Sequence, residues 1–319
     1  MSTQAPVVYR CSNVISTFSD SIIEKENWIK DIMKNPVPMN LSREEEQSFQ
    51  QTQDCHICNL SLGTNRVRDH DHLTGKYRGA AHNQCNLAFR FPKLNQKQEN
   101  SFIISIVFYN LRDYDSYLLM ESLSKHTKRR IQYIPNNKEQ HISFLLGCLC
   151  FIDSFQFLGT SLEKLISNLA AKGKGEFKLL TRCITDAAKK DLLLRKGVYP
   201  YDYIYSPARL AETALPPPEA FYNILSQEGI SAEDYAYAER VWKAFQCATI
   251  GDYHDVYLKS DVILLADVFE SFRNTAMETY KLDLAHCFTA PGFSWDSMLK
   301  YTIDVVHSHG QIVVSTVII

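Results

Sequence analysis

Two pairs of metal-ligand residues constrain this chain more than any other feature of its sequence. Cys55 and Cys58 are separated by two residues, and His82 and Cys85 repeat that spacing further along the chain. Thiolates and imidazoles at such spacings form the tetrahedral sites that hold structural zinc. The alternative, cysteines that merely pack in a core, does not account for four ligand-type side chains at these offsets. We therefore predict one structural Zn²⁺ bound by these four residues, with His82 and Cys85 on one face at the start of a helix.

The segment between the two ligand pairs predicts a β-hairpin followed by a short helix. Residues 66–72 can form a strand, residues 73–76 give a glycine-containing turn, and residues 77–79 begin a second strand. Residues 83–91 read as a helix that Pro92 ends. Zinc would tie the ends of this ββα arrangement together.

Four consecutive titratable residues, Asp69-His70-Asp71-His72, lie at the end of the first predicted strand. A purely structural zinc ribbon does not require them. A nuclease does, because a histidine deprotonates water and oxygen ligands hold a divalent ion against the scissile phosphate. Asp69 and His70 point to opposite faces of a regular strand, so both reach one phosphate only if the strand is bulged or ends there.

The motifs CxxC, DHDHxTGxxRG and HxxCN in residues 55–86 resemble the His-Me finger (HNH) nucleases of the phage recombination endonuclease VII type. The resemblance implies that His70 is the general base and that His72 assists at the phosphate. It implies that Asp69 and Asn86 bind a catalytic Mg²⁺ or Mn²⁺. The four zinc ligands would match the family's four cysteines, with a histidine replacing one of them. A zinc-stapled module that contacts DNA without cleaving it stays open as the alternative.

The net charge of −2 provides no global basic field, so any DNA contact must come from local patches. The basic side chains expected to contact single-stranded or branched DNA near the hairpin are Arg66, Arg68, Lys76 and Arg78. Nine cysteines, three of them assigned to zinc, indicate a reducing compartment rather than a disulfide framework, so we expect an intracellular protein, nuclear or cytoplasmic. No apolar run approaches the ~20 residues of a membrane helix. The sequence identifies no protein partner.

The rest of the chain predicts a mixed α/β (α+β) body. The apolar run 102–108 suits a strand buried on both faces, and Asp115 follows it at a strand-to-helix corner, as a helix cap, a metal ligand or both. Tyr257 and Asp261 share one face of a long helix, a pairing that by spacing alone is usually solvated. Residues 171–191 are expected to be surface loop, and residues 312–319 an exposed apolar tail.

Taken together, FYNLRDYD and YLKSD resemble the second and third exonuclease motifs of family B DNA polymerases. SLEKL, which begins with Ser161 and Leu162, resembles a motif that contacts single-stranded DNA in the protein-primed branch. Over residues 5–305 the chain looks like the organellar and viral-type polymerases of Polinton (Maverick) transposons. This implies a ribonuclease H-like exonuclease core with Asp115, Tyr257 and Asp261 at an exonuclease-type metal. The same resemblance assigns DNA contact to Asn110, Ser161 and Leu162.

The family's first exonuclease motif would lie upstream of this chain and its polymerase palm downstream. We therefore expect a polymerase fragment, truncated at both ends, whose incomplete core holds too few carboxylates for two-metal hydrolysis. The expected parts are an N-terminal helical piece of the exonuclease region (1–50), the endonuclease VII-like zinc module (51–95), an exonuclease-like domain (101–285) and the start of the polymerase region (286–319). A domesticated interaction module, or a truncated product that folds poorly, stays open.

Overall fold

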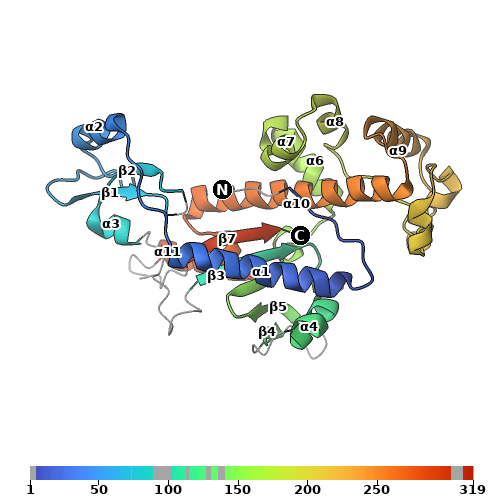
Figure 1. Cartoon of the computed structure of the whole chain (residues 1–319), viewed down its shortest axis with the longest axis horizontal. Helices are drawn as coiled ribbons and strands as arrows, with labels where there is room; N and C mark the ends of the chain where they lie inside the picture. Colours follow the sequence, from blue (N-terminus) through green and yellow to red (C-terminus); the bar gives the residue numbers. More distant parts are fainter. Residues whose placement is uncertain are drawn as a thin grey trace.

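The computed structural model describes residues 5–72, 74–88, 102–112, 115–126, 131–135, 141–302 and 312–318. A small hairpin module lies at one end of the molecule and a larger α/β body makes up the rest (Figure 1). Among the described helices, none combines the length and the apolar character that crossing a membrane demands.

The body is built on a five-stranded mixed sheet in the order β4-β5-β6-β3-β7. Its strands are β3 (Phe102–Phe108), β4 (Ile131–Pro135), β5 (His141–Leu146), β6 (Leu149–Asp153) and β7 (Ile312–Ile318). The strands β4, β5 and β6 are antiparallel, whereas β3 is parallel to both β6 and β7. The predicted strand 102–108 is thus confirmed as a central strand. The expected exposed tail is wrong, because residues 312–318 pair with β3 along its length.

Helices cover both faces of this sheet, which explains the continuous apolar run of β3. Ile104 and Ile106 belong to a buried cluster with α1 (Val14–Lys34) and α4 (Asp115–His126). Val107 faces the other way, into a cluster with Phe269 of the long helix α10 (Ile250–Tyr280). A strand buried on both faces has no solvated side that would impose alternation.

Helix α10 organises the remainder of the body. The elements packed around it or leading into it are α5 (Phe155–Leu158), α6 (Leu162–Lys172), η1 (Lys174–Glu176), α7 (Lys178–Cys183), α8 (Ala187–Leu192), η2 (Pro207–Ala211), η3 (Pro218–Phe221), α9 (Ala232–Ala244), η4 (Leu284–His286) and α11 (Ala290–Thr302). In Figure 1, α6, α7 and α8 lie on the side of α10 that faces away from the sheet.

The segment 171–191, expected as surface loop, instead forms η1, α7 and part of α8. Phe177 and Leu180 are completely buried. The carboxylate of Asp267 on α10 accepts hydrogen bonds from the backbone N–H groups of Leu179 and Leu180 at 2.8 and 2.9 Å. This capping by a residue distant in sequence satisfies the first turn of α7, and no local pattern in the segment could reveal it.

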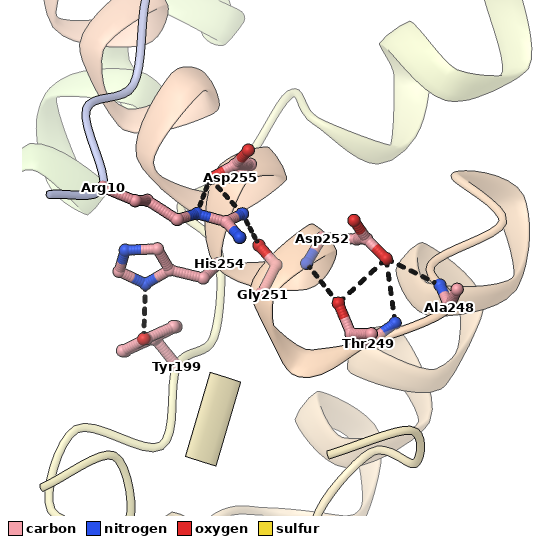
Figure 2. A network of polar contacts seen from close by, with 8 residues as sticks. All are labelled: Arg10, Tyr199, Ala248, Thr249, Gly251, Asp252, His254 and Asp255. Carbon is pink, nitrogen blue, oxygen red and sulfur yellow. Dashed lines mark hydrogen bonds and ion pairs between the residues drawn. The ribbon is translucent and has the colours of Figure 1, made fainter. Parts of the chain in front are cut away.

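The N-terminal segment is tied to the start of α10 by Arg10 (Figure 2). Its guanidinium pairs with Asp255 at 2.6 Å and donates to the carbonyl oxygen of Gly251. A Cβ at Gly251 would lie 2.6 Å from Arg10 Nη1, so a side chain there would displace the guanidinium from its present position. Nearby, Tyr199 Oη and His254 Nδ1 are 2.5 Å apart. This contact packs Tyr199, in the aromatic segment 198–203, onto the body.

Candidate functional site

The hairpin module comprises α2 (Arg43–Gln51), β1 (Arg66–His70), β2 (Tyr77–His82) and α3 (Asn83–Ala88). Ser42 and Glu45 form the capping box that a Ser-x-x-Glu pattern indicates at the start of a helix, here α2. Between α2 and β1 the chain makes a tight knuckle, in which Cys55 N–H donates to Leu60 O and Asn59 N–H donates to Cys55 O. This knuckle presents Cys55 and Cys58 toward the end of β2.

Four ligand atoms, from Cys55, Cys58, His82 and Cys85, all lie within 4.8 Å of one another. His82 Nδ1 is 3.4 Å from the Cys58 sulfur and 3.8 Å from the Cys85 sulfur. Tetrahedral zinc with ordinary Zn–S and Zn–N bonds would set these atoms about 3.6 Å apart. The donor set and its spacing therefore fit a structural zinc ion. In the part of the chain that the structure describes, no other group of three or more such side chains converges in this way.

The second nitrogen of His82 is also used. Nε2 lies 2.9 Å from the carbonyl oxygen of Ser61, so it carries the proton and Nδ1 remains for the metal. Ligating histidines in zinc sites are usually oriented in this manner. His82 is the last residue of β2 rather than a helix residue, so the predicted common helical face with Cys85 is wrong. The strand end and the start of α3 bring the pair together instead.

The thiols of the cluster already differ in acidity. Burial would raise the pKa of Cys55, but backbone N–H groups of Cys58, His82 and Ile57 donate to its sulfur and lower the pKa to about 6. Burial, with the neighbouring cysteines, raises the pKa of Cys85 to about 11. One thiolate is therefore favoured near neutral pH, and a bound cation would release the protons of the others.

The hairpin is bulged at the two residues that matter most. Asp69 pairs with Gly79 and His70 pairs with Tyr77, so Arg78 is the extra residue, and β1 ends at His70. The sequence required a bulge or a strand end at this position for Asp69 and His70 to act together. Both are present.

The turn after β1 is held by Asp71. Its carboxylate accepts from the backbone N–H of Thr74, and its carbonyl accepts from that of Gly75. Gly75 has φ +73°, and a Cβ there would lie 2.5 Å from the carbonyl oxygen of Pro38. Asp71 thus shapes the turn, while its neighbours Asp69, His70 and His72 remain the candidates for chemistry.

Asp69 is buried, with 3% of its surface exposed. Its Oδ2 lies 3.0 Å from His56 Nε2 and 3.5 Å from Arg78 Nε. His56 lies inside the Cys55–Cys58 knuckle, and the sequence pattern alone did not mark it as a functional residue. The one available signal was the glycine at position 79, because a Cβ there would come within 2.8 Å of the His56 ring.

His70 and His72 lie side by side, with ring centroids 4.4 Å apart. Arg78 donates to the carbonyl oxygen of His70 at 2.7 Å. Burial, followed by the charges of His70 and Arg78, lowers the pKa of His72. Asn86 is half-buried on α3, which packs against both strands, but no hydrogen bond joins it to Asp69 within the described ranges.

The basic residues predicted to contact DNA divide into two pairs. Arg68 forms a two-pronged pair with Glu46 of α2 at 2.7 and 2.9 Å, and Arg66 donates to the carbonyl oxygen of Phe49. Both guanidinium groups also lie over the Phe49 ring. Lys76, directly before β2, and Arg78, in β2, are exposed. Arg66 and Arg68 therefore hold α2 to the hairpin.

The predicted exonuclease-type residues lie in the body, on separate elements. Asp115 is the first residue of α4, and burial together with the charge of Asp153 raises its pKa. Asp153, at the end of β6, is buried and accepts from the backbone N–H groups of Asn110 and Arg112. The sequence analysis gave Asp153 no role. Asn110 itself adopts a left-handed conformation with φ +60°.

Tyr257 and Asp261 lie on α10, where both are largely buried. The hydroxyl of Tyr257 bonds to that of Tyr201, and a Cβ at Gly197 would lie 2.7 Å from its ring. Asp261 Oδ1 is buried and has no hydrogen-bond partner within the described residues, and burial raises the pKa of this carboxyl. The two are not a solvated helix face.

The SLEKL motif begins at the N-terminus of α6. Ser161 caps this helix by accepting from the backbone N–H of Lys164. Leu162 is 6% exposed and packs in the core beside α10. The predicted DNA contact by Leu162 would therefore require its side chain to leave that core.

The comparison with family models matches residues 34–102 to recombination endonuclease VII. Searches of curated proteins and of solved structures found no significant match. The matched range contains the complete Cys₃His cluster and the bulged hairpin. The chain therefore carries an endonuclease VII-like domain within a mixed α/β structure, and the cluster points to structural zinc.

Proposed function

We propose that this protein binds and cleaves DNA through its endonuclease VII-like, zinc-stabilised hairpin. The observation that supports cleavage most directly is that β1 ends at His70, directly after Asp69 and beside the Arg78 bulge of β2. At the end of a strand, the strict alternation that would turn these two side chains to opposite faces no longer applies. Single-stranded or branched DNA is the proposed substrate.

His70 acts in this proposal as the general base. It accepts a proton from the attacking water as the new P–O bond forms and the bond to the leaving sugar oxygen breaks. His72, whose lowered pKa keeps it neutral at neutral pH, donates a hydrogen bond to a phosphate oxygen. Lys76 and Arg78 contact backbone phosphates, which carry most of the binding energy.

Asp69 and Asn86 would hold a Mg²⁺ or Mn²⁺ ion, which supplies a Lewis acid for the phosphate. Magnesium usually keeps several waters and binds few protein oxygens, so two side chains are a sufficient donor set. Both contacts found for the Asp69 carboxylate fall on Oδ2, which leaves Oδ1 as the oxygen for the cation.

The direct test is nicking of plasmid and of branched DNA by zinc-loaded protein with added Mg²⁺. His70→Ala should lower the rate by about 100-fold or more, the usual contribution of a general base. Asn65→Ala, in the exposed loop before β1, is the control and should cleave normally. Absence of cleavage by the parent protein on every DNA form would refute the enzymatic function.

For the body we propose the ribonuclease H-like exonuclease core of a viral or transposon-type family B DNA polymerase. The mixed sheet supports this, as do Asp115 and Asp153 beside the ends of β3 and β6 and the buried Tyr257–Asp261 pair on α10. Asp115 and Asp261 are the proposed metal ligands of a core too poor in carboxylates to cleave. The expected result is no trimming of 3′ ends with Mg²⁺ or Mn²⁺, and metal-dependent trimming would contradict the proposed inactivity.

A non-catalytic DNA-binding module is the second candidate. One observation favours it: the carboxylate of Asp69, the proposed cation ligand, is already engaged by His56 and Arg78. In that case the His70→Ala variant binds DNA with the same affinity as the parent protein. Cys55→Ser abolishes DNA binding, because it removes the zinc that holds the hairpin.

A further inference from the structure

The imidazole of His56 joins the zinc-ligand knuckle to the carboxylate of Asp69. Its Nε2 is 3.0 Å from Asp69 Oδ2, and an ionised carboxylate only accepts, so the imidazole donates. Because Asp69 is only 3% exposed, water cannot readily replace a lost donor. The hydrogen bond from His56 therefore satisfies a buried carboxylate of the hairpin.

The orientation of His56 is fixed from two sides. Its neighbours Cys55 and Cys58 belong to the Cys₃His cluster, and its backbone N–H donates to the carbonyl oxygen of Ala80 at 2.9 Å. On the other side the ring lies against Gly79, where a Cβ would approach three of its atoms to 2.8–3.0 Å. Any side chain at position 79 would displace the ring from Asp69.

We propose that His56 is a positioning residue that transmits the order of the zinc-bound knuckle to Asp69. It fixes the carboxylate through Oδ2 and thereby presents Oδ1 to a divalent cation. The inference rests on the proposed function in one respect, that Asp69 is a ligand of that cation. Zinc then acts on the cleavage site through a specific hydrogen bond as well as by holding the fold. Loss of such an outer partner typically weakens metal binding or activity by about 10- to 100-fold.

Two substitutions separate the ring from its hydrogen bond in the full-length, zinc-loaded protein. His56→Phe keeps an aromatic ring against Gly79 but has no donor, whereas His56→Gln places an amide N–H near the position of Nε2. Leu60→Ser, on the same knuckle with a side chain 67% exposed, is the control. The readouts are zinc content, the dissociation constant of Mn²⁺ from electron paramagnetic resonance of the free ion, and the DNA nicking rate.

We expect His56→Phe to keep its zinc and to bind Mn²⁺ about 10- to 100-fold more weakly, with a matching loss of nicking. His56→Gln should recover most of both. Unchanged Mn²⁺ binding in His56→Phe overturns the proposal. Loss of zinc in His56→Phe also overturns it, because the residue would then serve the knuckle alone.

A parent protein that neither binds Mn²⁺ nor nicks DNA would refute the proposed function but not yet the link between the two residues. A double-mutant cycle of His56→Phe and Asp69→Ala decides that case, with unfolding followed by the absorption of Co²⁺ substituted for zinc. Coupling of about tenfold in the unfolding equilibrium constant supports the link. Additive effects of the two substitutions overturn it.

Discussion

His82 donates through Nε2 to the carbonyl oxygen of Ser61 and turns Nδ1 toward the sulfurs of Cys58 and Cys85. This arrangement fixes the tautomer of the ligand before any metal binds. We expect Cys58→Ser to lower zinc affinity by more than about 100-fold, since a lost ligand costs more than a lost outer partner. Metal analysis and competition with a chelator measure it. Cys11→Ser, at an exposed cysteine outside the cluster, should keep its zinc.

Gly79→Ala should destabilise the hairpin module by about 1–3 kcal/mol, the usual cost of overpacking. The added methyl would lie 2.8 Å from the His56 ring, on a backbone with φ +156° that L residues rarely adopt. Gly63→Ala is the matched control, because Gly63 also has a positive φ, +54°, but open space around it. Denaturation of the zinc-loaded protein measures both. Equal losses in the two variants would mean that backbone strain, not the His56 contact, sets the cost.

Local patterns in the sequence were sufficient for the metal cluster and for several of the helices and strands. The ligand spacing, the capping box of Ser42 and Glu45, and the apolar run 102–108 each act within a few residues, and the structure confirms all three. The bulge could only be stated as a requirement, because it depends on how two strands pair.

The misses share a physical cause, which is contact between residues distant in sequence. The helices in segment 171–191 depend on capping by Asp267, and residues 312–318 became a strand only through pairing with β3. Likewise, the sequence predicted that Arg68 contacts DNA, but its guanidinium pairs with Glu46 of α2, which lies 22 residues earlier in the chain. His56 was overlooked because its partner, Asp69, lies across the hairpin module rather than beside it in sequence.

Asp261→Asn should stabilise the body by about 1 kcal/mol at pH 7, the scale of an unsatisfied buried group. Asp261 Oδ1 is buried without a partner in the described part of the chain, and burial raises its pKa above the ordinary value of 3.8. The folded state therefore binds a proton more tightly than the unfolded state, so the wild-type protein gains stability as the pH falls through the raised pKa. In urea denaturation, the difference in the free energy of unfolding between the variant and the wild-type protein should therefore decrease as the pH falls through that range. A difference that stays constant with pH would contradict this account.

His254→Phe should remove part of the acid sensitivity of the body. Burial, followed by the charge of Arg10, lowers the pKa of His254 below its ordinary value of 6.5 (Figure 2). The unfolded state then binds the proton first, so this residue's contribution to stability is complete above about pH 7.5 and declines as the pH falls below 6.5. At pH 7.5 the variant should be less stable by about 1 kcal/mol, because the Tyr199 hydroxyl loses its hydrogen-bond partner 2.5 Å away. Urea denaturation from pH 8 to pH 5 should show that deficit shrinking, whereas a deficit that grows toward low pH would mean that the protonated imidazole is the stabilising form.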